Sequence, residues 1–206
     1  MAYKSYGDYL QALDRAGELL RIAEPVATEL EVTEIADREM KKAGGGKALL
    51  FEKPTVHGVI SKIPLAINTL GSFRRMALSL EAESIEAVAT ELGSLLKAKP
   101  PTSLKEAAAL LSTALELRHA RPKMVKEAAC QEVVKTFEAP ARATSWPNAP
   151  DCLKGERPNG PLATLLDLPI QQCWPMDGGR FITLPCVVTK DPDTGERNVG
   201  MYRMQV

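Results

Sequence analysis

The stretch that decides the fold is Phe181–Val206, FITLPCVVTKDPDTGERNVGMYRMQV. Its two halves, Phe181–Thr189 and Asn198–Val206, are rich in apolar and β-branched residues and flank the turn-forming sequence DPDTG at 191–195. Two strand-like runs around a short turn with Gly predict a β-hairpin. A hairpin alone is only marginally stable in water and leaves an open edge, so we expect further polypeptide to continue this sheet.

The N-terminal part of the sequence begins with two helical patterns. Apolar residues recur every three or four positions and Gly17 follows the last of them, which predicts a first helix near 5–16. Thr28 and Glu31 have the spacing of a capping box, in which both side chains satisfy the first free backbone N–H groups of a helix. This box predicts a second helix that runs to about Ala43.

Strand and helix patterns then follow in turn. Short apolar runs at 48–51 and 64–68 have the length of strands. The helical period dominates between 72 and 117, and a capping box of Ser103 and Glu106 predicts the start of the last helix there. The pattern is therefore α/β rather than all-helical.

A change in composition marks the expected domain boundary. Residues 130–137 have the pattern of a strand, whereas 139–163 is rich in Pro, Ala, Asn and Gly and has no period. We interpret the second range as an irregular linker or long surface loop. The sequence thus predicts an α/β (α+β) protein with a mixed domain over 1–128 and the beginning of a β-rich domain over 129–206.

Composition excludes several classes of function. The 206 residues contain 26 Lys and Arg and 26 Asp and Glu, so no charge excess would bind nucleic acid or an anionic membrane surface. No apolar run reaches the roughly 18 residues of a membrane span. Two histidines and the lack of a GxSxG motif argue against a zinc site and a Ser-His hydrolase. Four scattered cysteines without a CxxC pair, and no signal peptide, predict reduced thiols in the cytoplasm.

Two motifs resemble ligand sites but are better explained as turns. Asp191 and Asp193 have EF-hand spacing, yet the next Gly falls one position early and Tyr202 stands where the closing Glu would be. Gly44–Gly46 precedes a strand rather than a helix and lacks a GxGxxG or Walker pattern. We predict a hairpin turn at the first motif and a helix stop with a turn at the second.

The second strand of the hairpin carries residues suited to an anionic ligand. Asn198 offers a neutral oxygen for a hard metal ion, Gly200 permits close approach to the backbone, and Arg203 has a planar guanidinium that matches carboxylate or phosphate. Because 198 and 203 differ by an odd number, a regular strand would point them to opposite faces. If both serve one ligand, one must lie at a strand end or a bulge. Composition alone would favour a solvent-exposed Arg and a turn-forming Asn.

Read from end to end, the chain resembles the N-terminal part of the UbiD family of prenylated-FMN-dependent decarboxylases. The most specific blocks are LPIQQCWPMDGGRFITLP at 168–185 and TKDPDTGERNVGMYRMQV at 189–206. Further blocks follow the family's order: YGDYLQALDRAGELLRI at 6–22, LEVTEIADR at 30–38, ALLFE at 48–52, PLAINTLGSFRRMALSL at 64–80 and CQEVV at 130–134.

The resemblance implies that the β-rich second domain is the beginning of a split β-barrel that binds flavin. It implies prenylated FMN and Mn²⁺ as cofactors, with K⁺ as a further candidate cation, and it assigns Asn198 to the metal. Flavin contacts fall on Thr183, Met201, Tyr202 and Arg203. Arg203 also matches the family's catalytic arginine, which would hold the substrate carboxylate.

In such enzymes the prenylated flavin adds as an azomethine ylide to an unsaturated acid, carbon dioxide leaves, and a glutamic acid supplies a proton. The implied function is reversible, non-oxidative decarboxylation of a small aromatic or α,β-unsaturated carboxylic acid. The full-length form is expected to be a homo-oligomer. Family chains are much longer, and their remaining metal ligands and acidic residues lie beyond Val206, so we expect this fragment alone to be inactive.

Two other functions stay open at this point. A non-catalytic binding or assembly module would pair its open strand edge with another chain, which predicts a stable oligomer. A flavin-binding reductase of the split-barrel type would retain flavin without decarboxylating an acid.

Overall fold

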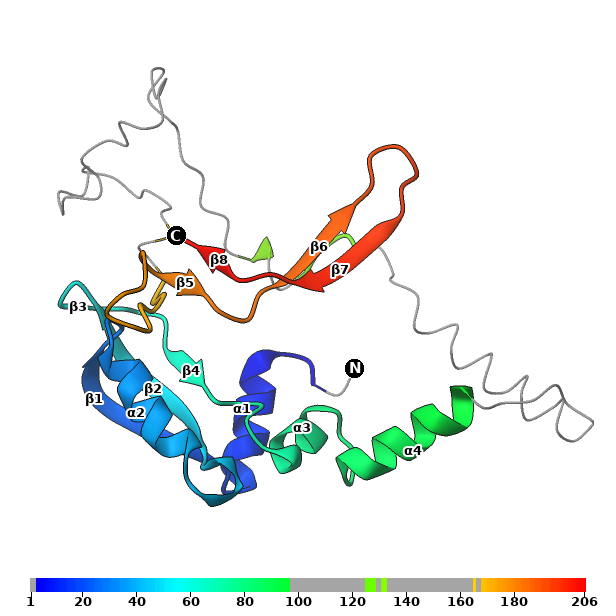
Figure 1. Cartoon of the computed structure of the whole chain (residues 1–206), viewed down its shortest axis with the longest axis horizontal. Helices are drawn as coiled ribbons and strands as arrows, with labels where there is room; N and C mark the ends of the chain where they lie inside the picture. Colours follow the sequence, from blue (N-terminus) through cyan, green and yellow to red (C-terminus); the bar gives the residue numbers. More distant parts are fainter. Residues whose placement is uncertain (1–2, 97–124, 129–130, 133–164, 166–167) are drawn as a thin grey trace, which may run out of the picture. The chain divides into compact units, whose positions relative to one another are not determined.

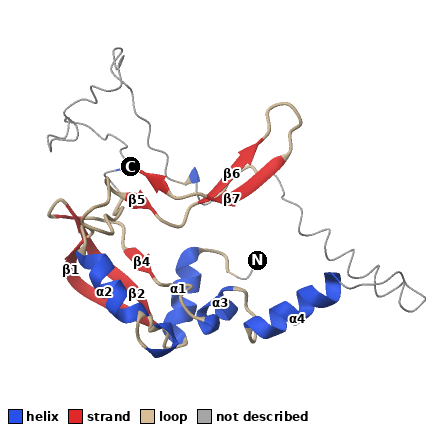
Figure 2. Ribbon diagram, viewed as in Figure 1, coloured by secondary structure: helices blue, strands red, loops and turns tan. Residues whose placement is uncertain are grey.

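A computed structural model gives the fold of the chain (Figure 1). The structure describes residues 3–96, 125–128, 131–132, 165 and 168–206. Its contacts divide the chain into one unit made of residues 1–89 and 164–206 and another made of residues 90–163. Helices and strands are mixed along the described residues (Figure 2), which confirms the predicted α/β class. The predicted boundary between residues 128 and 129 stays a prediction.

The first half of the chain folds into helices and a small sheet. In chain order its elements are α1 (Tyr6–Arg15), β1 (Leu19–Ala27), α2 (Glu31–Met40), the 3₁₀ turn η1 (Ala43–Gly45), β2 (Ala48–Val56), β3 (Val59–Ile60), β4 (Leu65–Ile67), α3 (Phe73–Ser79) and α4 (Ile85–Leu96). The strands predicted at 48–51 and 64–68 are therefore present, and so are helices over the described part, up to residue 96, of the helical range predicted from 72.

The central strand of the sheet is β2. It pairs in parallel with β1 and antiparallel with β3 and β4 (Figure 1). Residues 48–51 of this strand are all buried, without the alternation of a half-exposed strand. A continuous apolar run is typical of a strand that is covered on both faces.

Two helices cover the two faces of β2. Ala48 and Leu50 lie in one apolar cluster with Tyr9 and Leu13 of α1. Leu49 and Phe51 point the other way and pack in a second cluster, with Val32 and Ala36 of α2. Because successive side chains of a strand point to opposite faces, α1 and α2 lie on opposite sides of the sheet.

Strand β1 was not expected from the sequence. Its residues include Arg21, Glu24 and Pro25, and its pairing with β2 shifts register between Ile22 and Pro25. Proline has no N–H to donate, so within sheets it is confined to edges and irregular positions. The interruption hides the strand from a search for regular alternation.

The first helix agrees with its prediction. The Ser5 hydroxyl accepts a hydrogen bond of 3.1 Å from the Asp8 N–H, which caps α1 at its start. Gly17 follows the last turn with φ of 70°, a conformation that favours glycine.

The predicted capping box of Thr28 and Glu31 is wrong. Thr28 is fully buried and still belongs to the sheet, because its N–H and its hydroxyl both donate to the carbonyl oxygen of Thr55. The Glu31 carboxylate accepts from the Ala27 N–H at 2.8 Å. Helix α2 therefore begins after Leu30 and ends at Met40, three residues before the predicted end.

Some predicted elements lie outside the described residues. These are the helix opened by Ser103 and the irregular range 139–163. Of the strand predicted at 130–137 only residues 131 and 132 are described, and they form a turn in which the Gln131 N–H donates to Ala128 O. No helix in the part of the chain that the structure describes is long and apolar enough to cross a membrane.

The C-terminal stretch forms two short antiparallel ladders instead of one long hairpin. Its strands are β5 (Phe181–Ile182), β6 (Cys186–Lys190), β7 (Arg197–Met201) and β8 (Met204–Gln205). β6 pairs with β7, and β5 pairs with β8. The predicted hairpin is thus confirmed, but each of its two strands is interrupted.

The turn of this hairpin explains the DPDTG sequence. The Asp191 carboxylate accepts hydrogen bonds from the N–H groups of Asp193 and Thr194, and Gly195 has φ of 74°. These two donors stabilise the charged form and lower the pKa of Asp191. The residues form the predicted hairpin turn.

Candidate functional site

The interruption between the two ladders brings a register shift. Ile182 pairs with Met204, and Cys186 pairs with Met201, so the three residues 183–185 lie opposite the two residues 202–203. An unequal number of residues between two paired segments is the property of a β-bulge. The extra residue lies in 183–185, so the alternation of side chains shifts on that strand and not on the strand that carries Asn198 and Arg203.

The residues predicted for the flavin and the metal lie around this break. Thr183 belongs to its longer side, Tyr202 and Arg203 form its shorter side, and Met201 is the last residue of β7. Asn198 lies within β7 and pairs with Thr189. All five of these predicted site residues are exposed.

The ring of Tyr202 folds back over Gly200. A Cβ atom added to Gly200 would stand 2.5 Å from the Tyr202 ring, so no larger residue fits there without a shift of the ring. Because Asn198 and Gly200 are two residues apart in one strand, they face the same side. Asn198 and the Tyr202 ring therefore share one face of β7.

Arg203 is held by residues that precede β5 or lie within it. Its guanidinium lies 3.8 Å from the centroid of the Phe181 ring, and one of its nitrogens lies 3.7 Å from the Asp177 carboxylate. The Arg203 side chain is 50% exposed and that of Asp177 is 17% exposed. Within the described residues, no interaction joins Arg203 to Asn198, so the expected convergence of the two on one ligand stays a prediction.

The loop before β5 is closed by Asp177. Its N–H donates to Trp174 O, and its carboxylate accepts from the Trp174 N–H, each at 3.1 Å. Gly178 then lies against β8, because its carbonyl oxygen accepts from the Gln205 amide at 3.0 Å. The WPMDGG sequence thus forms a compact turn beside the strand that follows Arg203.

The donor set suits a cation only in part. Among the residues that the structure describes, no group of three or more His, Cys, Asp and Glu side chains could hold a metal ion. Asn198 would supply one neutral oxygen. A hard cation takes about six oxygen ligands, so a phosphate and other groups would have to complete a site at Asn198.

The buried side chain of Arg180, the residue before β5, connects this strand to the N-terminal sheet by hydrogen bonds. Arg180 donates to the Thr28 hydroxyl at 2.8 Å, to Ile170 O and to the Glu29 carboxylate. Burial lowers the pKa of Arg180. The backbone of Gln172 adds two hydrogen bonds to the same edge: its carbonyl oxygen accepts from the Leu30 N–H at 3.0 Å, and its N–H donates to Thr28 O at 3.1 Å.

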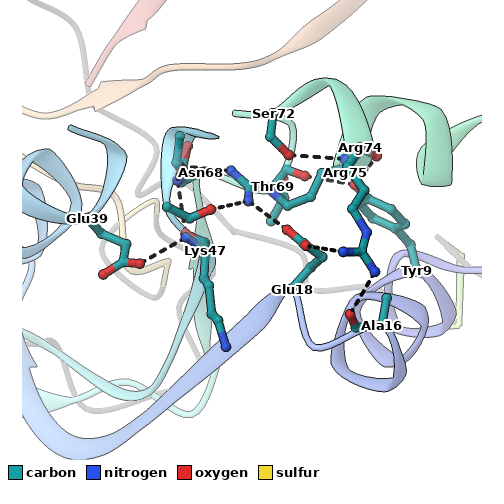
Figure 3. Close-up of polar contacts among 12 residues, drawn as sticks. Tyr9, Ala16, Glu18, Glu39, Lys47, Asn68, Thr69, Ser72, Arg74 and Arg75 are labelled. Atoms are coloured by element: carbon teal, nitrogen blue, oxygen red, sulfur yellow. Dashed lines mark hydrogen bonds and ion pairs between the residues drawn. The ribbon is translucent and has the colours of Figure 1, made fainter. Parts of the chain in front are cut away.

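A second polar cluster lies in the N-terminal part, where Glu18, Asn68 and Arg75 come together (Figure 3). It surrounds the turn at Gly44–Gly46. Arg75 is fully buried, donates to Gly45 O and Gly46 O, and forms an ion pair of 3.1 Å with Glu18. The Asn68 amide donates to Gly45 O and Lys47 O, both at 2.9 Å. The turn therefore presents its carbonyl oxygens to these two side chains.

The glycines of this turn are required by close backbone approach. A Cβ on Gly45 would stand 2.2 Å from Gly71 O, and one on Gly46 would stand 2.0 Å from Glu39 O. Next to the turn lies a surface hollow of about 630 Å³ with both signs of charge on its wall. Two of its cations are already paired, Lys42 with Glu39 at 2.6 Å and Arg74 with Glu18 at 3.3 Å, which agrees with a structural turn rather than a phosphate cradle.

Sequence reasoning missed Arg75 as a core residue. The helical pattern places Phe73 and Leu80 on the apolar side of α3, yet Phe73 is 73% exposed while Arg75 is completely buried. The sequence does not show that Arg75 contacts the glycine turn. The carbonyl oxygens of Gly45 and Gly46 need hydrogen-bond donors, and the guanidinium of Arg75 supplies them.

Two models of one enzyme family match the chain. The model of the 3-octaprenyl-4-hydroxybenzoate carboxy-lyase N-terminal domain matches residues 10–96, and the model of the Rift-related domain of the same carboxy-lyase matches residues 146–206. Together they cover more than two thirds of the chain.

Two of the relatives that match this chain are uncharacterized proteins. One from Aquifex aeolicus is 39% identical over 204 residues, and one from Archaeoglobus fulgidus is 39% identical over 207 residues. These alignments cover 99% and 100% of this chain but 36% of each relative. The chain therefore spans about a third of the length of the curated relatives that it matches.

Solved structures show the same fold. The vanillic acid decarboxylase of Sedimentibacter hydroxybenzoicus in its closed form matches 99% of this chain and 35% of its own, with a TM-score of 0.65 and 24% identity. An evolved dimeric form of the UbiD-class enzyme HmfF from Pelotomaculum thermopropionicum, in complex with prenylated FMN, matches 98% of this chain and 36% of its own, with a TM-score of 0.55 and 23% identity.

Proposed function

The chain belongs to the UbiD family of carboxy-lyases, and we propose that it is the N-terminal part of a decarboxylase acting on an aromatic or α,β-unsaturated carboxylic acid. The reaction would be reversible and non-oxidative. The single observation that carries the proposal is the position of Arg203 between β7 and β8, where its side chain is 50% exposed and its guanidinium has the geometry that suits a carboxylate. The family models favour this enzyme over an assembly module or a reductase.

The role of Arg203 follows from its surroundings. The Phe181 ring covers one face of the guanidinium, and half of the Arg203 side chain remains exposed. A guanidinium can donate two parallel hydrogen bonds to one carboxylate, which fixes the orientation of an acid as well as its charge. Arg203 would therefore hold the carboxyl group that leaves as carbon dioxide.

The other four predicted residues would contact the cofactors. Thr183, Met201 and Tyr202 are exposed around the break and would lie along a flavin, and Asn198 would give one oxygen to a Mn²⁺ ion on the flavin phosphate. When bound, prenylated FMN supplies an acceptor for the electrons of the bond to carbon dioxide. A K⁺ ion is a further candidate.

The proposal can be tested by reconstitution. The purified protein is mixed with prenylated FMN and MnCl₂, freed of excess ligand and examined by its flavin absorbance. We expect retained absorbance that is lost in Asn198→Ala. The matched control is Thr189→Ala, which removes the polar side chain paired with Asn198 in the same ladder but no proposed ligand.

A second measurement addresses the reaction. Release of carbon dioxide from cinnamate-like and hydroxybenzoate-like acids is followed in the flavin-loaded protein, alone and with the polypeptide that completes the family's length. Activity of the completed protein that is lost in Arg203→Ala supports the proposal. A protein that retains no flavin and releases no carbon dioxide in either form contradicts it.

We also propose a homo-oligomer of the full-length form in the cytoplasm. Cys173 and Cys186 are free thiols, as expected in a reducing compartment. Light scattering of the full-length protein measures the oligomer, and a monomer at every concentration would contradict it.

A further inference from the structure

The guanidinium of Arg203 has two neighbours from one short segment. The Phe181 ring covers its face at 3.8 Å, and the Asp177 carboxylate lies 3.7 Å from one of its nitrogens. The second distance is that of an ion pair without a direct hydrogen bond. The Asp177 carboxylate therefore compensates the charge of Arg203 without accepting a direct hydrogen bond from its guanidinium.

Asp177 is held in place by hydrogen bonds within its own turn, independently of Arg203. The carboxylate oxygen that faces Arg203, Oδ2, is the one that accepts the Trp174 N–H. The Asp177 N–H returns a hydrogen bond to Trp174 O, so the side chain is part of a closed turn and is largely buried. A carboxylate that cannot rotate freely gives the guanidinium a defined direction.

Phe181 is fixed by the sheet. It lies in β5 and pairs with Gln205 of β8, two residues after Arg203. A guanidinium over an aromatic face is attracted by the ring quadrupole. The ring thus limits the guanidinium to one plane, and Asp177 attracts one end of it.

We propose that Asp177 is the positioning residue of Arg203, and that its carboxylate competes with the substrate carboxylate for the guanidinium. The proposal rests on the function proposed above, in which Arg203 binds an acid. The effect of Asp177 is to hold the guanidinium over Phe181 while the site is empty and to weaken the binding of any anion there.

The test is Asp177→Asn, which removes the charge but keeps an oxygen for the Trp174 N–H. The first readout is the Nε–H resonance of Arg203 in the purified protein, assigned by its loss in Arg203→Lys. We expect this resonance to shift and its exchange with water to quicken. The matched control is Asp191→Asn, which removes the same charge from another carboxylate that accepts turn N–H groups.

The second readout is the affinity for benzoate in the flavin-loaded protein. Partly exposed ion pairs are weak, so we expect benzoate to bind about two- to fivefold more tightly to Asp177→Asn than to wild type at low salt. The difference should shrink at about 0.5 M NaCl, because salt screens charges and would not alter a purely structural effect. Asp191→Asn should bind benzoate like wild type.

The outcomes separate this inference from the proposed function. If Asp177→Asn leaves the Arg203 resonance and the benzoate affinity like wild type, the inference is overturned. If benzoate does not bind even to wild type, the proposed role of Arg203 fails, while the resonance still decides whether Asp177 holds the guanidinium. Should Asp177→Asn fail to fold, Asp177→Ser replaces it, because its hydroxyl can also accept the Trp174 N–H.

Discussion

Two arginines show how the same side chain serves two regions of this molecule. Arg75 is completely buried between the glycine turn and Glu18, and three acceptors bind its guanidinium. Arg203 is half exposed beside the strand break, with a ring on one face and a carboxylate at a distance. The fold binds both terminal nitrogens of the first guanidinium, whereas the side chain of the second arginine is half exposed.

The largest expected effect is on stability at the buried arginine. Arg75→Met removes the ion pair with Glu18 and the donors to Gly45 O and Gly46 O. Arg74 would still pair with Glu18, and Asn68 would still donate to Gly45 O. Breaking a buried ion pair by removing one partner costs about 3–5 kcal/mol. We expect a loss of this size in the free energy of unfolding, measured with urea.

The neighbouring residue provides the control for that variant. Arg74 is 67% exposed and pairs with Glu18 at 3.3 Å. Arg74→Met should lower the free energy of unfolding by less than about 1 kcal/mol. Equal losses in the two variants would contradict the distinction between a buried and an exposed guanidinium.

The glycine turn that Arg75 holds gives the next effect. Gly46→Ala would place a Cβ atom 2.0 Å from Glu39 O at a φ of 55°, and we expect a loss of stability of about 2 kcal/mol or more. Gly44→Ala has a similar φ of 74° and no atom within 4 Å of its Cβ. It should cost only about 1 kcal/mol, and both variants are compared by thermal unfolding.

The phenol that lies beside Arg75 predicts a pH dependence. The Tyr9 hydroxyl lies within hydrogen-bond distance of two acceptors, Thr69 O at 2.7 Å and Arg75 O at 3.0 Å, and burial raises its pKa from 10.0 to about 12. The raised pKa contributes stability that is fully present below pH 10 and is lost as pH rises through about 12. The loss is at most about 2.7 kcal/mol.

Tyr9→Phe tests this pH dependence. The variant has no phenol at position 9 to ionise, so its free energy of unfolding should fall less between pH 10 and pH 12 than that of wild type. Tyr6→Phe removes the neighbouring phenol, which is the second cause of the raised pKa of Tyr9, and should change the slope less than Tyr9→Phe does. Parallel curves for wild type and Tyr9→Phe would contradict the prediction.

The smallest expected effect is at the open arginine. Arg203→Met removes a half-exposed charge whose ion pair is long, so the free energy of unfolding should change by less than about 1 kcal/mol. The same variant should lose decarboxylation in the completed, flavin-loaded protein. A loss of stability as large as that of Arg75→Met would show that Arg203 serves the fold.

Much of the fold was predictable where local chemistry decides it. The helix α1 has its own cap at Ser5, and the hairpin has its own turn at Asp191–Gly195. The buried run of β2 needs no alternation because both of its faces are covered. In the first two cases neighbours in the sequence contain the cause, and in the third the continuous apolar run is itself the signal.

The errors arose where distant residues decide. Thr28 has the spacing of a cap, yet the carbonyl oxygen of Thr55 and the guanidinium of Arg180 hold it in the sheet. Arg75 is buried because a turn 29 positions earlier in the chain needs donors, which a helical period cannot indicate.

The candidate site was predicted by resemblance more than by physics. Parity alone required a strand end or a bulge between Asn198 and Arg203 if both serve one ligand. In the structure β7 ends at Met201, and the extra residue of the bulge lies on the opposite strand, at 183–185. The roles of these two residues still come from the family, and no described contact joins them. The neighbours of Arg203, Phe181 and Asp177, could not be paired with it from spacing alone.

Between the two ladders, three residues at 183–185 lie opposite two residues at 202–203. This difference bears on how the segment tolerates insertions and deletions. Removing one residue from 183–185 would leave two residues opposite two, so the ladders β5–β8 and β6–β7 could join into one uninterrupted hairpin. Such a hairpin would be more regular, but its backbone groups would bond to each other. We therefore expect a shortened chain to fold and to lose the proposed contact between the strand and a ligand.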